Sequence, residues 1–331
     1  MKMAEYWHRL DADRLQCDLC PHECKLCNGE TGLCRVRGAR EGEMKALCYG
    51  MISSAHIDPI EKKPLYHFYP GSTIFSIGGW GCNLSCAFCQ NWTISQEAML
   101  NSRRYSAEEI VQQVSTSQSI GIAYTYNEPL IAFEFVRDCA RLTRDKGLAN
   151  VLVTNGYIKR EPAGKLLAVI DALNIDVKSM DEGFYASHCR GRLAPVLAFA
   201  KQARDVGCHV EITNLVIPGL NDEESQFQTL ASWVSGNLGR ATPLHLSAYR
   251  PQYRMDISAT SLSSLERGFA VCSEELDYVY LGNIVSEHGQ DTRCPDCQTI
   301  LISRHGYAVV MRDIVKTACG KCGRKLNIRF G

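Results

Sequence analysis

The sequence has no apolar run long enough to cross a membrane, no low-complexity segment and no excess of either charge. Its longest apolar runs, such as Leu166 to Val169, fall far short of the ~18 residues that a transmembrane helix needs. Residues 1–10 carry charges where a secretory signal peptide has an apolar core. We therefore expect a cytoplasmic protein without a membrane anchor.

The absence of a net charge also argues against partners that are recognised mainly through charge. The 36 basic residues balance 36 acidic ones, so no overall field draws the chain to nucleic acid or anionic lipid. A hydrophobic content of 45% and a charged content of 22% are typical of a soluble globular enzyme. At 331 residues the chain can form one large α/β domain with small appendages, or two domains of ordinary size.

Cysteine, in contrast, is abundant, with 17 residues. In a reducing cytoplasm this density indicates metal ligation rather than disulfides. Five cysteines stand alone and are expected in the core as small hydrophobic residues: Cys48, Cys139, Cys189, Cys208 and Cys272. The others form three groups: Cys17, Cys20, Cys24, Cys27 and Cys34; Cys82, Cys86 and Cys89; and Cys294, Cys297, Cys319 and Cys322.

Between the outer cysteine groups, β-rich runs alternate with helical ones, which indicates repeated βα units around a parallel sheet. Strands are expected at Thr73–Ile77, Gly121–Tyr126, Asn150–Thr154, Ala172–Val177, Cys208–Ile217, Pro243–Ala248 and Asp277–Leu281. Helices are expected at Ser106–Gln118, Pro129–Lys146, Pro162–Val169, Leu193–Val206, Asp222–Val234 and Leu262–Leu276.

This pattern predicts an α/β fold, a partial (β/α)6 TIM-like barrel, at residues 71–290. A cysteine-rich segment at 1–70 precedes it, and a zinc-ribbon-like module at 291–331 follows it. Chemistry in such folds lies beyond the carboxyl ends of the strands. The polar candidates there are Asn127, Glu128, Thr154, Asn155, Asp176, Lys178, Glu211 and His245.

The central triplet, Cys82-x3-Cys86-x2-Cys89, follows the first strand through a glycine-rich turn. Glycines let the backbone approach a bulky ligand closely. A structural zinc site or an ordinary four-iron cluster needs four ligands, whereas three leave one metal position open. The less favoured alternatives are a zinc half-site and thiols spaced so by chance.

The cysteine spacing, the aromatic Phe88 before the last cysteine and the position after the first strand resemble the radical S-adenosylmethionine (SAM) superfamily. The resemblance implies that the triplet binds a 4Fe-4S cluster whose open iron chelates the amino and carboxylate groups of SAM. One electron from a donor such as ferredoxin or flavodoxin then breaks a carbon–sulfur bond. The resulting 5′-deoxyadenosyl radical takes hydrogen from a substrate.

Motifs along the whole chain are similar to one subfamily, the radical SAM component of the AmmeMemoRadiSam system, a relative of the pyruvate formate-lyase activating enzymes. They are Tyr6-Trp7, Cys20 to His22, Asp58 to His67, and Cys89 to Trp92. The similarity implies Memo-like and AMMECR-domain partners. Two alternatives are a glycyl-radical-enzyme activase acting on a partner protein and, less favoured, a non-catalytic zinc scaffold.

The same resemblance implies a SAM pocket. Asn127 and Glu128 occupy the place of a Gly-Gly-Glu-Pro-like element, although its glycines are absent; they could instead cap the helix that begins at Pro129. Asp176 and Lys178 resemble an Asp-x-Lys element, but they could equally pair with neighbours in the barrel. The further expected contacts are Phe88, Thr154, Asn155, Glu211 and His245, the last with a structural histidine as its alternative.

The outer cysteines suggest further metal sites. Cys294-x2-Cys297 and Cys319-x2-Cys322 have zinc-ribbon spacing, which predicts structural zinc, with an auxiliary 4Fe-4S cluster as the minority alternative. Cys17, Cys20, Cys24 and Cys34 can complete a four-thiolate site, with Cys27 and His22 in reserve, for zinc or iron–sulfur. Asp58 to His67 is expected to cross the barrel mouth.

Overall fold

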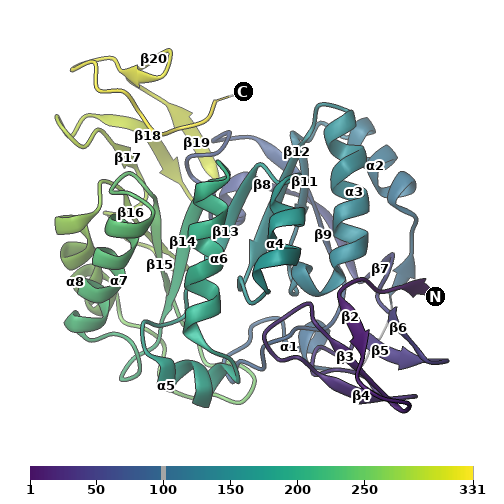
Figure 1. Cartoon of the computed structure of the whole chain (residues 1–331). Coiled ribbons are helices and arrows are strands. Elements are labelled where there is room, and N and C mark those ends of the chain that lie inside the picture. Colours follow the sequence, from purple (N-terminus) through teal and green to yellow (C-terminus); the bar gives the residue numbers. More distant parts are fainter. Residues whose placement is uncertain (98–101, 331) are drawn as a thin grey trace.

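The computed structural model describes residues 1–97 and 102–330. Its centre is an open sheet in the order β16-β15-β14-β13-β12-β11-β9-β8 (Figure 1). All neighbours are parallel except β8, which is antiparallel to β9. The strands are β8 (Ser54–Pro59), β9 (Thr73–Gly78), β11 (Gly121–Tyr124), β12 (Ala149–Thr154), β13 (Ala172–Asp176), β14 (His209–Val216), β15 (Leu244–Ala248) and β16 (Val279–Gly282).

Helices cover the outer face of this sheet, as Figure 1 shows. They are α2 (Ala107–Thr116), α3 (Phe133–Asp145), α4 (Arg160–Leu167), α6 (Leu193–Asp205), α7 (Glu224–Asn237) and α8 (Leu262–Glu275). The short helices α1 (Trp92–Ser95) and α5 (Glu182–Phe184) lie beyond the strand ends. Short turns are η1 (Ile60–Lys62), η2 (Pro129–Ala132) and η3 (Tyr185–Cys189). Ser106 caps α2 and forms the expected capping box with Glu109. The predicted partial α/β barrel is confirmed.

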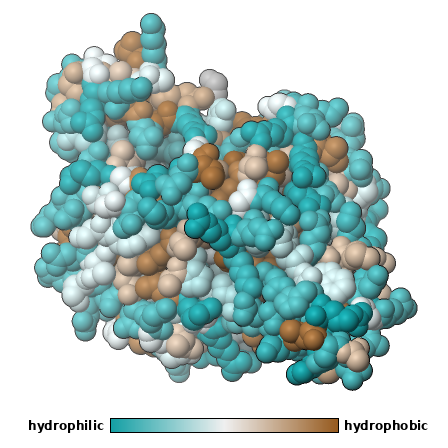
Figure 2. Space-filling model, in the orientation of Figure 1, coloured by the Kyte–Doolittle hydropathy of each residue, from teal (hydrophilic) through white to brown (hydrophobic). Residues whose placement is uncertain are grey.

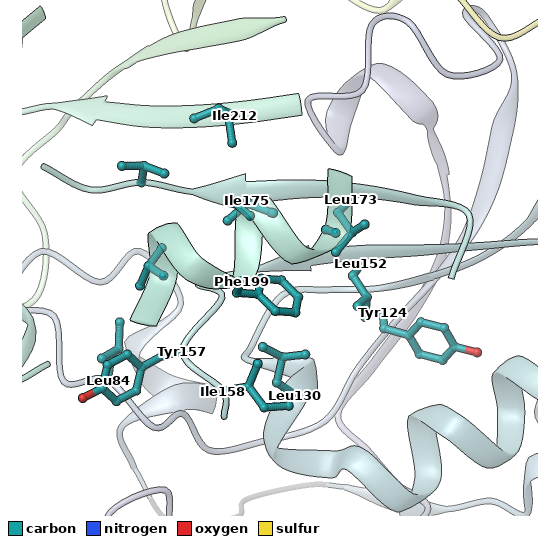
Figure 3. Packing of buried hydrophobic residues seen from close by; sticks show 14 of the residues in the cluster. Leu84, Tyr124, Leu130, Leu152, Tyr157, Ile158, Leu173, Ile175, Phe199 and Ile212 are labelled. Carbon is teal, nitrogen blue, oxygen red and sulfur yellow. The ribbon is translucent and has the colours of Figure 1, made fainter. Parts of the chain in front are cut away.

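The core lies between the sheet and its helices. Apolar side chains of neighbouring strands, such as Leu152, Ile175 and Ile212, are fully buried, and Figure 3 shows them in one layer with Phe199 of α6. Phe199 and Ile175 converge on Gly156, where an added Cβ would lie 3.0 Å and 3.4 Å from them. Burial on both faces explains why these strands are continuous apolar runs in the sequence.

The N-terminal segment forms two small sheets, β2-β3-β4 and β1-β6-β5, beside α3. The buried guanidinium of Arg37 pairs with the carboxylate of Glu134 on α3 at 2.9 Å. Because each charge is buried, each stabilises the fold only while its partner is present. The strands are β1 (Lys2–Met3), β2 (Trp7–Arg9), β3 (Arg14–Cys17), β4 (Lys25–Cys27), β5 (Arg37–Arg40), β6 (Glu43–Ala46), β7 (Met51–Ile52) and, paired with β7, β10 (Arg103–Arg104).

The segment from Asp58 to His67 lies at the end of the barrel opposite to the one predicted. β8 pairs Ser54 with Gly78 and Pro59 with Thr73, so it carries the chain from the carboxyl end of β9 back to its amino end. Residues 60–72 therefore cross the amino ends of the strands. The prediction of a segment across the mouth was wrong, because sequence spacing does not reveal that β8 is antiparallel.

The C-terminal module packs on this amino end. The amide of Arg329 donates to the carbonyl of His67 at 2.8 Å, and the amide of Tyr69 donates to the carbonyl of Arg329 at 2.8 Å. The guanidinium of Arg304 reaches the carbonyl of Tyr66 at 2.8 Å. The strands are β17 (Thr292–Arg293), β18 (Ile300–His305), β19 (Ala308–Met311), β20 (Ile314–Val315) and β21 (Ala318–Cys319). The module thus covers the end away from the cysteine triplet.

The visible surface is mostly hydrophilic, with small separate hydrophobic patches (Figure 2). Within residues 1–97 and 102–330, no helix combines the length and apolar character needed to span a bilayer.

Candidate functional site

The cysteine triplet lies on the loop that leaves β9, and the glycines before it are sterically required. A Cβ on Gly78 would lie 2.9 Å from the carbonyl oxygen of Thr125, and one on Gly79 would lie 3.1 Å from that of Met51. Gly81 has a φ of +82°, and a side chain there would collide with the carbonyl oxygen of Cys34. The glycine turn therefore lets the loop pass closely between the barrel and the N-terminal segment.

The loop is also held from the side by the π-helical turn η3. The amide of Ser85 donates to the carbonyl of Cys189 at 2.8 Å, and the amide of Ala87 donates to that of His188 at 2.9 Å. π-helical turns are rare and often occur at functional sites. These backbone bonds fix the chain on both sides of Cys86.

Hydrogen-bonding groups contact two of the three cysteine sulfurs. The sulfur of Cys82 accepts from the amide of Leu84 at 3.4 Å and from the side-chain amide of Asn155 at 3.6 Å. The hydroxyl of Ser95 lies 3.1 Å from the sulfur of Cys89. Such donors stabilise a thiolate, which is the form that binds metal. The three residues therefore fit an iron–sulfur cluster.

The surroundings of the three thiols also shift their pKa values. Burial raises the pKa of Cys82 and of Cys89, whereas contact with the Cys189 thiol lowers the pKa of Cys86. Cys189 was expected to be an ordinary core cysteine, and it is fully buried. Its position against Cys86 is invisible in the sequence, because the two residues lie far apart along the chain.

Asn127 and Glu128 support the loop. The side-chain oxygen of Asn127 accepts from the amide of Gly79 at 2.8 Å, and its nitrogen donates to the carbonyl of Gly81 at 3.0 Å. Glu128 caps η2 by accepting from the amide of Leu130 at 2.9 Å. The capping alternative for Glu128 is therefore the one the structure displays.

Glu128 also joins the third strand end to the loop. Its carboxylate accepts from the hydroxyl of Thr154 at 2.7 Å and from the amide of Asn155 at 2.8 Å. Burial raises the pKa of Glu128 to about 7, although these donors lower it. Thr154 and Glu128 thereby orient Asn155, whose side chain reaches Cys82.

Asp176 and Lys178 lie at the carboxyl end of β13 and form an ion pair at 3.1 Å. The Asp176 side chain is 37% exposed, so part of it is free to contact a ligand. Burial lowers the pKa of Lys178, but the negative charges of Asp176 and of the Cys86 sulfur raise it by more, so the net shift is upward. The ammonium of Lys178 also lies 5.9 Å from the ring centroid of Phe88, which places this pair beside the cysteine loop.

Thr213 of β14 is another polar residue of this region, from the strand end where the sequence also predicts Glu211. It pairs in register with Asp176, and its hydroxyl is buried without a hydrogen-bond partner among the described residues. A buried hydroxyl usually has a partner, so this one is available to a ligand.

Glu211 and His245 lie apart from the loop, near the amino ends of β14 and β15. The buried Glu211 carboxylate accepts from the amides of Tyr66 and His67 at 3.0 Å and 2.7 Å. It also bonds to Nε2 of His209 at 2.9 Å and of His245 at 2.6 Å. This position does not support the expected cofactor role, because two of the bonds hold the segment that crosses the barrel bottom and the other two hold histidines of β14 and β15.

The four C-terminal cysteines form a compact group, with their sulfurs all within 4.8 Å of one another. The distances are 3.5 Å between Cys294 and Cys322 and 3.6 Å between Cys297 and Cys319. Tetrahedral zinc with Zn–S bonds of 2.3 Å separates its sulfurs by about 3.8 Å. The predicted four-cysteine site is confirmed, and its spacing suits a single metal ion.

Comparisons with known proteins agree with this geometry. A family model described as the radical SAM superfamily matches residues 77–230. An uncharacterised protein of Methanocaldococcus jannaschii is 40% identical over 99% of each chain. The pyruvate formate-lyase 1-activating enzyme of Escherichia coli is 25% identical over 51% of this chain and 71% of that enzyme. The fold also resembles a radical SAM methyltransferase from Sphaerobacter thermophilus, with a TM-score of 0.52, 17% identity and coverage of 65% and 67%.

Proposed function

This chain belongs to the radical SAM superfamily, an enzyme family with radical chemistry. We propose that it cleaves SAM reductively at a 4Fe-4S cluster on Cys82, Cys86 and Cys89. When bound, the cluster and SAM supply a 5′-deoxyadenosyl radical that takes hydrogen from a substrate. The observation that carries the proposal is the loop itself: three cysteines on a glycine turn, with hydrogen-bond donors aimed at two of their sulfurs.

The residues of the chain have separate tasks in this proposal. Asn127 and Glu128 hold the loop and the third strand end in place. Asn155 donates to the Cys82 sulfur. Asp176 and Thr213, adjacent on β13 and β14, offer a carboxylate and a free hydroxyl for contacts with SAM.

The test is anaerobic incubation of the reconstituted protein with SAM and dithionite. We expect 5′-deoxyadenosine and methionine in amounts that depend on bound iron. Protein that holds its full iron content yet forms neither product would remove the proposal. A Cys86→Ala variant is the control, because a cluster with two protein thiolates is not retained.

A glycyl-radical-enzyme activase is the second candidate, and the similarity to an activating enzyme favours it. In this version the substrate is a glycine of a large partner protein. The test is whether the genome that encodes this chain also encodes a glycyl-radical enzyme, and whether mixing the two with SAM and reductant gives a glycyl radical signal. If it gives none, direct turnover of another substrate, with Memo-like and AMMECR-domain partners, becomes the better version.

The proposal also includes an electron donor and a structural metal. Reduced ferredoxin or flavodoxin can supply the single electron that SAM cleavage needs. The compact cysteine group at residues 294–322 supports zinc as the metal of the C-terminal module.

A further inference from the structure

We propose that Cys17, Cys20, Cys24 and Cys34 hold a second iron–sulfur cluster, which relays electrons to the cluster on the β9 loop. The existence of this second cluster is independent of the proposed function. The relay role, in contrast, rests on the proposed function, because a relay needs the SAM-binding cluster as its electron acceptor.

Local backbone bonds bring these cysteines together. β3 and β4 form a hairpin in which the amide of Cys17 donates to the carbonyl of Cys24 at 2.9 Å, with Cys20 in the turn between them. The chain then returns over this turn, since a Cβ on Gly32 would lie 3.3 Å from the sulfur of Cys24. Cys34 follows two residues later, and together with Cys17 and Cys24 it lies near enough to affect the Cys20 thiol electrostatically.

Burial selects four of the five N-terminal cysteines. Cys17 and Cys34 are 6% and 7% exposed, and Cys20 and Cys24 are half-buried. Cys27 is exposed and pairs in register with Arg14 on the outer side of the hairpin. The site therefore has the four thiolates that an iron–sulfur cluster takes.

Sulfur spacing distinguishes a cluster from zinc. Within the described residues, only the C-terminal cysteines gather with all sulfurs inside 4.8 Å, and neither the N-terminal set nor the β9 triplet does so. One zinc ion draws its ligands that close. The ligands of a 4Fe-4S cluster bind separate irons, so their sulfurs stand farther apart. The N-terminal set, like the triplet, is therefore not drawn together as the ligands of one zinc ion are, which is the arrangement that a cluster needs.

The N-terminal site touches the β9 loop directly. The carbonyl oxygen of Cys34 lies against Gly81, the residue before Cys82. Nε2 of His22, between Cys20 and Cys24, lies 2.7 Å from the carbonyl of Asn83, the residue after Cys82. An electron leaving the N-terminal site would therefore cross only a short contact path to reach the loop.

The surface beside this site suits a negatively charged donor. A groove of about 610 Å³ begins at Pro21 and Glu23 and carries more basic than acidic side chains, including Arg160, Arg192 and Lys201, whereas Lys159 is paired with Glu23. One electron passes from reduced ferredoxin or flavodoxin to the N-terminal cluster. The same electron then passes to the loop cluster and on to SAM, where one carbon–sulfur bond breaks, so the donor is oxidised by one electron for each bond broken.

The first test uses the full chain with Cys82, Cys86 and Cys89 all replaced by alanine. After anaerobic reconstitution we expect about four irons per chain and, on reduction, an electron paramagnetic resonance (EPR) signal that SAM does not alter. Adding Cys20→Ser should remove this iron, whereas adding Cys27→Ser should not. Zinc in place of iron, or no metal at these cysteines, would overturn the second cluster whether or not the native protein cleaves SAM.

The relay is tested on the unaltered protein by rapid mixing with SAM and reduced flavodoxin, followed by freezing. The signal of the N-terminal cluster, known from the alanine variant, should rise before 5′-deoxyadenosine forms and fall as it accumulates. 5′-Deoxyadenosine formed while that cluster stays oxidised would overturn the relay. No 5′-deoxyadenosine with any reductant would instead count against the proposed function.

Discussion

The side-chain amide of Asn155 donates to the sulfur of Cys82, with 3.6 Å between Nδ2 and Sγ. Residues on two different strand ends are thereby joined at the centre of the proposed site. Asn155 is itself fixed, since its side-chain oxygen accepts from the amide of Tyr157 at 2.8 Å and its amide also donates to Asn83 at 3.0 Å.

Removing this donor should make the cluster harder to reduce. A hydrogen bond to a ligand sulfur stabilises the more negative, reduced state, so Asn155→Ala should lower the reduction potential by on the order of tens of millivolts. The iron content should stay the same. An EPR-monitored redox titration measures this, and an unchanged potential would show that the contact has no influence on the cluster.

Asp176→Ala should weaken SAM binding without loss of iron. A lost hydrogen bond to a charged group costs about 1.5–3 kcal/mol, or roughly ten- to a hundredfold in affinity. The control is Glu161→Ala on α4, whose side chain is 77% exposed. The dissociation constant is measured anaerobically, and equal affinity in both variants would remove Asp176 from the SAM site.

Glu211→Gln should destabilise the barrel and leave SAM binding intact. An amide in place of the carboxylate replaces one acceptor oxygen by an NH2 donor, which then faces the buried donors of Tyr66 and His67 or the two histidines, at a cost of about 2–3 kcal/mol. Thermal unfolding measures this against Glu224→Gln, an exposed site on α7. A folded variant with weakened SAM affinity would restore Glu211 as a cofactor residue.

The Glu211 carboxylate should also make the stability of the fold depend on pH. Burial raises the pKa of Glu211, but the hydrogen bonds from His209 and His245 outweigh it and bring the pKa below its usual value. The stability from Glu211 is therefore present above its unfolded pKa and is lost as the pH falls below about 4.3. Glu211→Gln should show a weaker loss over this range in thermal unfolding, and equal slopes in both proteins would contradict the explanation.

Cys319→Ala should remove the proposed zinc ion and lower the midpoint of thermal unfolding by about 5–10 °C, because a site of three ligands loses metal-linked folding energy. The module lies at the end of the barrel away from the β9 loop, so folded protein should still cleave SAM. Cys27→Ser is the matched surface control. A stable Cys319→Ala protein unable to turn over its substrate would point to an auxiliary cluster or a substrate site.

The central strands could be predicted from the sequence because parallel strands buried on both faces are short apolar runs between helices. The triplet could be predicted because its ligands are close in sequence. How deep a polar residue lies in the barrel could not be predicted. Glu211 lies near the amino end of β14, and an apolar strand pattern does not show which of its residues lie at the carboxyl end, where the site is. The contact of Cys189 with Cys86 depends on the returning turn η3 and has no local signal.

The measurement that tests the account most directly is the EPR spectrum of the dithionite-reduced protein with and without SAM, followed by assay for 5′-deoxyadenosine. If Cys82, Cys86 and Cys89 hold a cluster with one open iron, SAM should change the spectrum and 5′-deoxyadenosine should form. Cys82→Ala, Cys86→Ala and Cys89→Ala should each lose both effects. A spectrum that SAM leaves unchanged, or 5′-deoxyadenosine formed by any of the three variants, would contradict the account.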